Sequence, residues 1–376
     1  MVRIENVRPL ALAGFLFFAA CGGSSAPPEY DFSAVDAAVE DFLASDRAAG
    51  LEGSGLIIVH RDHGVVHERA FGAFEEDRVY LVASSSKMVT AGVLNRLQDD
   101  GLLDLDAPIS DVVAWGDEHP GITAAQLISN SSGLKGLDPQ YGPHLCQFIW
   151  TGQTLQSCAE LIYTAPQNAD VTIPPDTSFR YGGAQWQVAG AVAEVASGKS
   201  WAELVDEIYV EPCGLQSFGF NNHFVQYPTG GGVLGYPIGF DGDPETLEPT
   251  ENPNMEGGLY TSVRDYGELL LMHLRGGTCG GNRVLSEESV WRMQEDRIQQ
   301  VYDGSAGRGQ GYGMGWWVSR DRPGWVSDGG AYGSFPWIDN ERGYAAFSVI
   351  EGDSGVGSQL AFDILDEIEA AIDSAG

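Results

Sequence analysis

The chain has 376 residues, 43% of them hydrophobic and 10% aromatic, which is enough for one large globular domain or two small ones. Its 53 acidic residues against 20 basic ones give a formal net charge of -33, and this imbalance disfavours nucleic acid and anionic lipid headgroups as partners. The acidic residues are spread along the chain, so they predict a solvated acidic surface rather than a tail.

The first residues have the pattern of an export signal. Arg3 and Arg8 give a positive start, an apolar run too short to span a bilayer follows them, and small residues stand directly before Cys21. This ending resembles a bacterial lipoprotein signal, which implies a lipidated Cys21 as the mature N-terminus; an ordinary secretion signal cleaved nearby is the alternative. We therefore expect an exported lipoprotein, anchored to a membrane and facing the periplasm or cell exterior, with a signal peptide at 1–20, a flexible tether at 21–30 and a globular domain at 31–376.

Four further cysteines follow Cys21, and an even number in an exported chain predicts two disulfides with three connectivities. We favour Cys146–Cys158, because it closes a short loop, and this leaves Cys213–Cys279 as the second bond.

The first part of the globular domain begins with a helical pattern over 32–50, in which Phe32, Val35, Val39 and Phe42 share one face. Two strands joined by a turn follow within 54–72. The next pattern predicts a helix from Ser84 to about residue 101.

The middle of the chain alternates helical patterns, such as 186–197 and 263–277, with loops rich in Gly and Pro. Strand patterns return within 311–319, 324–339 and 343–351, and 358–373 closes the chain as a helix. The predicted fold class is α+β, with one antiparallel sheet built from both chain ends, flanked by helices and carrying an inserted, mainly helical lobe.

The stretch "ASSSKMV" places three serines directly before Lys87. A serine hydroxyl becomes a good nucleophile only when a neighbouring base takes its proton. Residues three apart share a helix face, so Lys87 can serve Ser84 but neither of the two serines that follow it. The alternative is that Ser84 caps the helix and Lys87 points to solvent.

The surrounding segments resemble the serine β-lactamase and penicillin-binding protein superfamily, and are most similar to its class C β-lactamase-like and esterase-like members. The likeness runs from about residue 31 to the end and rests on the order and spacing of several segments. These segments are "GLIIVHRDHGVVHERAFG", "VASSSKMVTAGVL", "ITAAQLISNSSGL", "IPPDTSFRYGGAQWQVAGAV", "NMEGGLYTSVRDYGELL", "VLSEESVWRM" and "YGMGWWV".

The resemblance implies a nucleophile at Ser84, which would form an acyl-enzyme, and a base at Lys87. Lys87 would need to be neutral part of the time, which burial and nearby positive charge favour. Tyr181 matches the tyrosine of the family's second motif and would carry protons to and from the leaving group. The backbone N–H groups of Ser84 and Ala331 would form the oxyanion hole.

Two motifs depart from the family pattern. The third motif usually starts with a cation, whereas the matching residues here are Asp328, Gly329 and Gly330, which we expect to face the substrate. The second motif has Gly183 where asparagine is usual, and Asn130 replaces a histidine in another segment. A carboxylate at Asp328 would repel a substrate anion, so the sequence favours an esterase or amidase acting on neutral or cationic acyl substrates.

Other readings stay open. A β-lactamase or DD-peptidase is the alternative within the enzyme class, and a catalytically inactive lipoprotein that binds peptidoglycan or a protein is the alternative outside it. We expect a small-molecule or peptide acyl substrate and no cofactor, while the oligomeric state is undetermined. His60, His63 and His67 lie close together but match no zinc motif, so no metal site is predicted.

Overall fold

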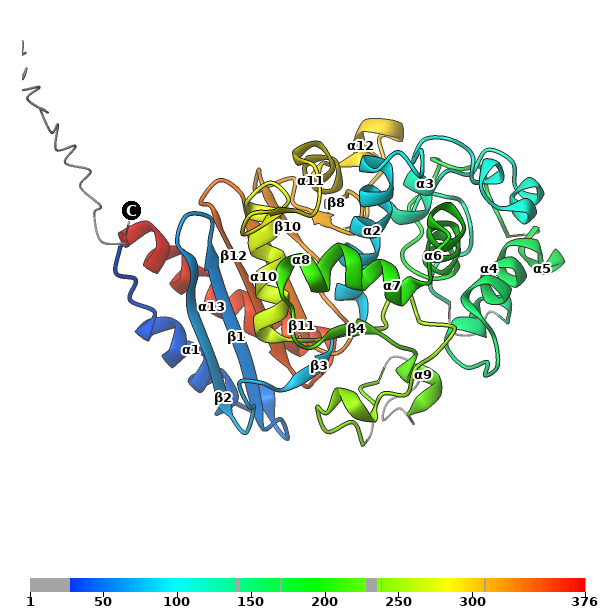
Figure 1. Ribbon diagram of the computed structural model, residues 1–376. Helices are drawn as coiled ribbons and strands as arrows, with labels where there is room; N and C mark the ends of the chain where they lie inside the picture. The colour runs from blue at the N-terminus through cyan, green and yellow to red at the C-terminus, as the bar shows by residue number, and fades with distance from the viewer. Residues whose placement is uncertain are drawn as a thin grey trace, which may run out of the picture.

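The computed structural model describes residues 28–138, 142–169, 171–227, 235–237, 239–307 and 309–375 (Figure 1). The predicted signal peptide, Cys21 and most of the tether lie outside the described residues. The helices are α1 (Ser33–Leu43), α2 (Lys87–Asp99), α3 (Ala124–Ile128), α4 (Leu155–Thr164), α5 (Pro166–Ala169), α6 (Ala184–Ser197), α7 (Trp201–Val205), α8 (Glu211–Cys213), α9 (His223–Gln226), α10 (Val263–Leu274), α11 (Glu287–Gln294), α12 (Arg297–Tyr302) and α13 (Ser354–Ala375).

A seven-stranded antiparallel sheet has the order β2-β1-β12-β11-β10-β9-β8. Its first two strands come from the start of the chain and the others from the end, so the predicted α+β fold with a sheet built from both ends is confirmed. The strands of the whole structure are β1 (Gly53–His60), β2 (Gly64–Gly72), β3 (Val79–Leu81), β4 (Phe218–Phe220), β5 (Leu259–Ser262), β6 (Thr278–Cys279), β7 (Asn282–Arg283), β8 (Gly311–Tyr312), β9 (Trp317–Val318), β10 (Trp325–Ser327), β11 (Ser334–Asp339) and β12 (Tyr344–Ile350).

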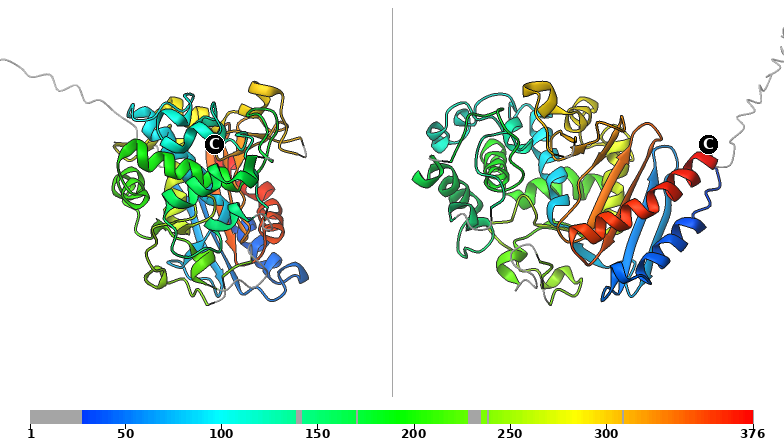
Figure 2. Two further views of the ribbon diagram at one scale, coloured as in Figure 1. Left: turned by 90° about the vertical axis from the view of Figure 1, so that its right-hand side faces the viewer. Right: turned by 180° about the vertical axis from the view of Figure 1, so that it is seen from behind.

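The sheet is buried on both faces, which explains the continuous apolar run in β1. Successive side chains of a strand point to opposite faces, so Leu56 and Ile58 pack with α1 and α13, while Ile57 and Val59 join the larger core on the other side. Figure 2 shows α13 crossing one face obliquely beside α1, and Figure 1 shows α10 against the opposite face.

The helical lobe predicted between the two halves of the sheet is present, with α2, α3, α4 and α6 packed together (Figure 1). Sequence patterns did not reveal a separate small sheet of the order β3-β5-β4. Each of these strands is three or four residues long. Short strands paired over such separations leave little periodicity to detect.

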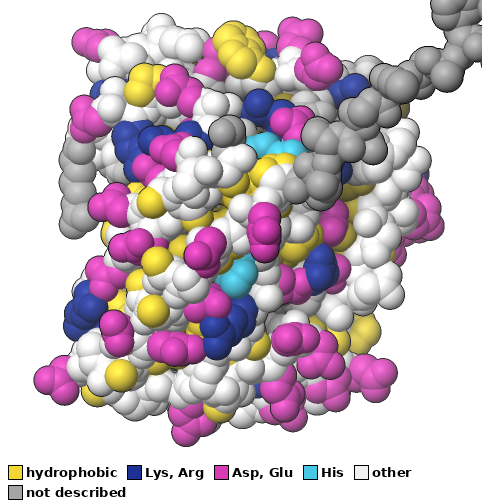
Figure 3. Space-filling view, turned by 90° about the vertical axis from the view of Figure 1, so that its left-hand side faces the viewer, with side chains coloured by type: hydrophobic (Ala, Val, Ile, Leu, Met, Phe, Trp, Pro, Cys, Tyr) yellow, Lys and Arg dark blue, Asp and Glu magenta, His cyan; other side chains and the backbone are white. Residues whose placement is uncertain are grey.

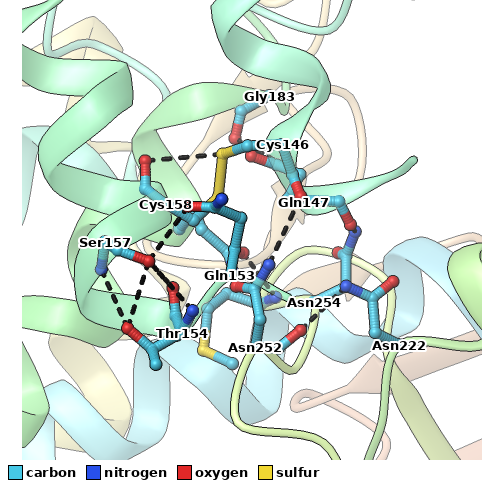
Figure 4. The surroundings of a disulfide bond; sticks show 12 residues. Cys146, Gln147, Gln153, Thr154, Ser157, Cys158, Gly183, Asn222, Asn252 and Asn254 are labelled. Atoms are coloured by element: carbon cyan, nitrogen blue, oxygen red, sulfur yellow. Dashed lines mark hydrogen bonds between the residues drawn. A yellow bond between two sulfur atoms is a disulfide. The ribbon is translucent and has the colours of Figure 1, made fainter. Parts of the chain in front are cut away.

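Both predicted disulfides are confirmed. Cys146 and Cys158 have Cα atoms 5.7 Å apart, and Cys213 and Cys279 have Cα atoms 5.0 Å apart. The first bond joins the loop before α4 to α4 itself and lies next to Gln147 (Figure 4).

Asp and Glu side chains are scattered over the face drawn in Figure 3, together with Arg, Lys and His, as expected for a solvated acidic surface. Within the part of the chain that the structure describes, no helix combines the length and the apolar composition that crossing a membrane requires.

Candidate active site

Ser84 lies in a short 3-10 turn, Ala83–Ser86, that connects β3 to α2. The two serines that follow it are buried and bonded to the backbone: the Ser85 hydroxyl donates to Asp328 O at 2.6 Å, and the Ser86 hydroxyl donates to Ala83 O at 2.6 Å. Ser84 is half-buried and lines a cavity. Of the three serines, only Ser84 can therefore meet a substrate, as the three-residue spacing to Lys87 indicated.

Lys87 is fully buried and points at Ser84. Its ammonium group donates to Ser84 Oγ at 3.0 Å and to Glu256 O at 3.0 Å, and its Nζ lies 3.5 Å from Glu256 Oε2. The same Nζ lies 4.7 Å from the centre of the Tyr181 ring. The alternative in which Lys87 points to solvent is wrong.

The ionisation of Lys87 differs from the sequence-based expectation. Burial lowers the pKa of Lys87, but the nearby Tyr181, Glu256 and Asp328 outweigh burial, so its pKa lies above the usual value. The expected help from nearby positive charge is absent among these neighbours, which are all acids. The amine is therefore held as an ammonium in the resting site.

Tyr181 lies in the turn that precedes α6 and lines the same cavity as Ser84. Burial raises the pKa of Tyr181, although Lys87 and a hydrogen bond with Ser84 act in the opposite direction, so the phenol keeps its proton. Its ring lies 5.1 Å from that of Trp317 on β9, measured between centroids.

Asn130 holds the turn that carries Tyr181. Its side-chain Oδ1 accepts from Gly182 N at 2.8 Å, Gln185 Nε2 at 3.1 Å and Trp186 Nε1 at 2.9 Å. Asn130 has φ of 58°, a left-handed conformation that asparagine adopts more readily than most residues. The residue that replaces the family's histidine thus positions the second motif.

Gly183 cannot be exchanged for asparagine in this backbone. Its φ is 78°, and a Cβ atom there would lie 2.6 Å from Gly136 C and 2.8 Å from Leu137 N. The departure from the family's second motif is therefore built into the local chain path, and the Gly183 N–H donates to Glu256 Oε2 at 2.7 Å.

Glu256 is a site residue that the sequence reasoning missed. Its side chain is nearly fully buried, with Oε2 facing Lys87 and Oε1 accepting from Gln147 Nε2 at 2.6 Å. Gln147 lies beside the Cys146–Cys158 disulfide, as Figure 4 shows. An acidic residue directly before two glycines in "NMEGGLY" is the signal that could have revealed it, because such a glycine-rich stretch allows close backbone approach.

Asp328 does not face the substrate as expected. Its side chain is fully buried and is absent from the cavity lining, where Ser327, Gly329 and Ala331 are found. Its Oδ2 accepts from Met88 N at 3.3 Å, and burial raises its pKa well above the usual range for aspartate. Asp328 therefore lies outside the cavity wall, and burial favours its protonated form.

Gly330 also points away from the cavity. A Cβ atom there would lie 2.1 Å from Val82 O and 2.3 Å from Ser334 Oγ, so only glycine fits between β11 and the turn before α2. Gly329 and Ala331 lie on the cavity side. The expectation that the whole third motif faces the substrate therefore holds for Gly329 and fails for its two neighbours.

The cavity has a volume of about 560 Å³ and brings together Ser84, Tyr181 and Ala331. Ser84, Tyr181 and Ala331 thus border one space, as a nucleophile, a proton carrier and an oxyanion hole would require.

The three histidines of the first hairpin do not form a cluster with other ligands. His60 and His63 stack at 4.5 Å between ring centroids, and His67 Nε2 binds Asp36 at 2.8 Å. Across the described ranges, no group of three or more His, Cys, Asp or Glu side chains is placed to hold a metal ion.

The model of the Beta-lactamase family matches residues 35–365 of this sequence. The chain belongs to the β-lactamase family. Its fold and its serine-hydrolase class follow from that membership and from the relatives below.

Among curated relatives of this β-lactamase-family chain, Penicillin-binding protein 4 of Amycolatopsis lactamdurans is 26% identical over 81% of the chain and 80% of its own length. Esterase EstB of Burkholderia gladioli is 28% identical over half of each chain. The crystal structure of the D-amino acid amidase of Ochrobactrum anthropi SV3 superposes with a TM-score of 0.67 at 19% identity, covering 90% of this chain and 99% of that one, and shows a shared fold.

Proposed function

We propose that the protein is an esterase-like or amidase-like hydrolase that forms an acyl-enzyme on Ser84 and acts on neutral or cationic acyl substrates. The observation that carries this proposal is the position of Ser84, which accepts a hydrogen bond from the buried Lys87 at 3.0 Å and lines a cavity together with Tyr181. Esterase and penicillin-binding relatives support the reaction class.

Lys87 must become neutral before it can take the serine proton. It first releases one proton to solvent, and substrate binding favours this release because burial away from water disfavours the charged amine. The neutral amine then takes the Ser84 proton while Oγ forms a bond to the carbonyl carbon. The backbone N–H groups of Ser84 and Ala331 would hold the oxyanion.

The second half of the reaction uses Tyr181. The bond to the leaving group breaks as the Tyr181 hydroxyl gives it a proton, and the phenol recovers a proton from Lys87. Water then attacks the acyl-enzyme by the reverse route, releasing the carboxylic acid and restoring the Ser84 hydroxyl.

Two departures argue against substrates that present a carboxylate to the third motif. The family's cation is replaced by Asp328, which is buried behind Lys87, and the family's asparagine is replaced by Gly183. Neither residue supplies a positive or amide group to the cavity. β-Lactams and D-alanyl peptides carry such a carboxylate, so we expect neutral esters to be better substrates.

Hydrolysis of p-nitrophenyl acetate and butyrate by the purified protein tests the proposal. We expect activity in the wild type and in Ser85→Ala, and loss of at least 1,000-fold in Ser84→Ala, as roughly expected for removal of a nucleophile. Intact mass after incubation with a fluorophosphonate should rise by one adduct in the wild type and not in Ser84→Ala. A wild type inactive towards esters, β-lactams and D-amino peptides would contradict the proposal.

The rival function is an inactive relative that binds peptidoglycan or a protein, and the two altered motifs favour it. A binding protein has no need of an activated serine, so it would leave the fluorophosphonate unreacted. A labelled Ser84 would exclude this rival.

We also propose that the chain is exported and anchored through a lipidated Cys21. The signal-like start of the sequence and two disulfides, which persist mainly outside the cytoplasm, support this. Metabolic labelling with a fatty-acid analogue should mark the wild type and not Cys21→Ala. Equal labelling of the two would refute the anchor.

A further inference from the structure

The cavity at Ser84 continues well beyond the reacting atoms. From Ser84 it passes Gly329 and Ala331 and reaches the first turns of α13, where Ser354, Ser358 and Phe362 line it. Figure 2 shows that α13 crosses the sheet so that its first turns lie at the side of β10 and β11. The volume of the cavity, about 560 Å³, lies within the usual range for sites that enclose a whole organic ligand.

The walls of this extension are aromatic. Trp325 on β10, Phe335 on β11 and Phe362 on α13 line it, and we call these three residues the aromatic arm. The rings of Phe335 and Phe362 lie 5.5 Å apart between centroids and meet edge to face. Phe362 is 55% exposed, whereas Trp325 and Phe335 are buried, so an apolar occupant would cover the most exposed ring.

The charges along the cavity do not favour an anionic occupant. Arg320 is the cation among the described lining residues, and it is already bound to Asp296 at 2.7 Å and to Gly304 O at 2.5 Å. The carboxylate of Asp321 lies in the same wall. Together with a net charge of -33, this arrangement repels a free carboxylate and tolerates a neutral ester.

The placement of Tyr181 fixes which part of the substrate enters the arm. A group that protonates the leaving atom must lie on the leaving-group side of the carbonyl carbon. Tyr181 lies in the turn before α6 in the helical lobe, whereas α13 packs against β11 and β12 of the main sheet. The acyl chain attached to Ser84 would therefore run the other way, past Ala331 towards Phe335 and Phe362.

We propose that the preferred substrates are neutral esters or amides whose acyl group is an extended apolar chain, held along the aromatic arm. This inference rests on the proposed acyl-enzyme at Ser84. Hydrolysis converts the neutral ester into a carboxylate in the same cavity as Asp321, and repulsion between the two charges would assist release of the product.

The test varies the acyl chain at constant leaving group, using p-nitrophenyl acetate, butyrate, octanoate and dodecanoate. We expect kcat/KM to rise with chain length by up to about fourfold for each methylene that becomes buried. Phe362→Ala should lower the octanoate-to-acetate ratio of kcat/KM by roughly threefold or more, since it removes apolar contact area. Ser358→Trp should move the optimum to shorter chains by filling the arm.

Trp291→Ala is the matched control, because Trp291 is an aromatic residue with 64% exposure on α11 and does not line the cavity. It should leave the chain-length profile unchanged. A flat wild-type profile, or an equal effect of Phe362→Ala on acetate and octanoate, would overturn the inference. If acetate is still hydrolysed through Ser84, either result refutes only the binding of the acyl chain along the aromatic arm. A wild type that is inactive on every ester refutes the proposed function as well.

Discussion

Glu256→Gln is the most informative single change, because it removes the carboxylate that faces a buried ammonium. Lys87 Nζ and Glu256 Oε2 are 3.5 Å apart, and at an effective dielectric constant of about 20 two unit charges at that distance attract by roughly 5 kcal/mol. Removing one partner of a buried pair usually costs about 3–5 kcal/mol of folding stability. We expect a loss of that size at pH 7, measured by urea unfolding.

The pH dependence separates this explanation from a simple packing defect. In the wild type the pKa of Lys87 is raised above its unfolded value, so its contribution to stability is complete below the unfolded pKa and is lost as pH rises through the folded pKa. Loss of Glu256 removes one of the charges that oppose the effect of burial, so the pKa of Lys87 should fall in the variant. The variant should therefore recover stability relative to the wild type as pH rises from 7 towards 10, and its ester hydrolysis should recover with it.

The control is Glu248→Gln, which removes the same charge from an exposed side chain. It should change the free energy of unfolding by less than about 0.5 kcal/mol at either pH. If Glu256→Gln were as stable as this control, or if its deficit were identical at pH 7 and pH 9.5, the charge pairing inferred for Lys87 would be refuted.

Three further changes test other parts of the site. Gly183→Asn should lower the urea-unfolding stability by about 2–4 kcal/mol, since it combines a left-handed backbone with overpacking against Gly136; an unchanged midpoint would contradict this. Asp328→Asn should gain stability relative to the wild type as pH rises above about 4, because burial raises the pKa of Asp328 and the wild type loses stability as pH rises from the unfolded pKa to the folded one; a stability difference between the two proteins that is the same at pH 4 and pH 8 in urea unfolding would contradict this. Replacing Cys146 and Cys158 by serine should lower the folding stability by about 3 kcal/mol. It should also lower kcat by displacing the loop whose Gln147 binds Glu256, whereas loss of the Cys213–Cys279 disulfide should lower stability alone. If the loss of either disulfide changed kcat equally, the connection between the first disulfide and Glu256 would be contradicted.

The sequence was sufficient for the parts of the site that depend on local spacing. Ser84 and Lys87 share a helical face, so their contact was predictable from a separation of three residues. The strands of the main sheet were predictable because β1, β11 and β12 are long apolar runs.

The predictions that were wrong depend on the direction in which a side chain points and on partners that are distant in the sequence. Whether Asp328 points into the cavity or behind Lys87 is decided by the pleat of the chain after β10, where a one-residue shift exchanges the faces. The ionisation of Lys87 depends on Glu256, which is 169 residues away in the sequence. Neither property leaves a local pattern.

The position of the chain ends bears on how the molecule meets large substrates. The described chain starts beside the last turn of α13 (Figure 1), whereas residues of the first turns of that helix line the cavity. A helix of 22 residues is about 33 Å long, so a support attached ahead of Pro28 would lie about that far from the part of the cavity that α13 lines. Immobilising the protein by its N-terminus should thus leave esters on bulky or insoluble carriers within reach.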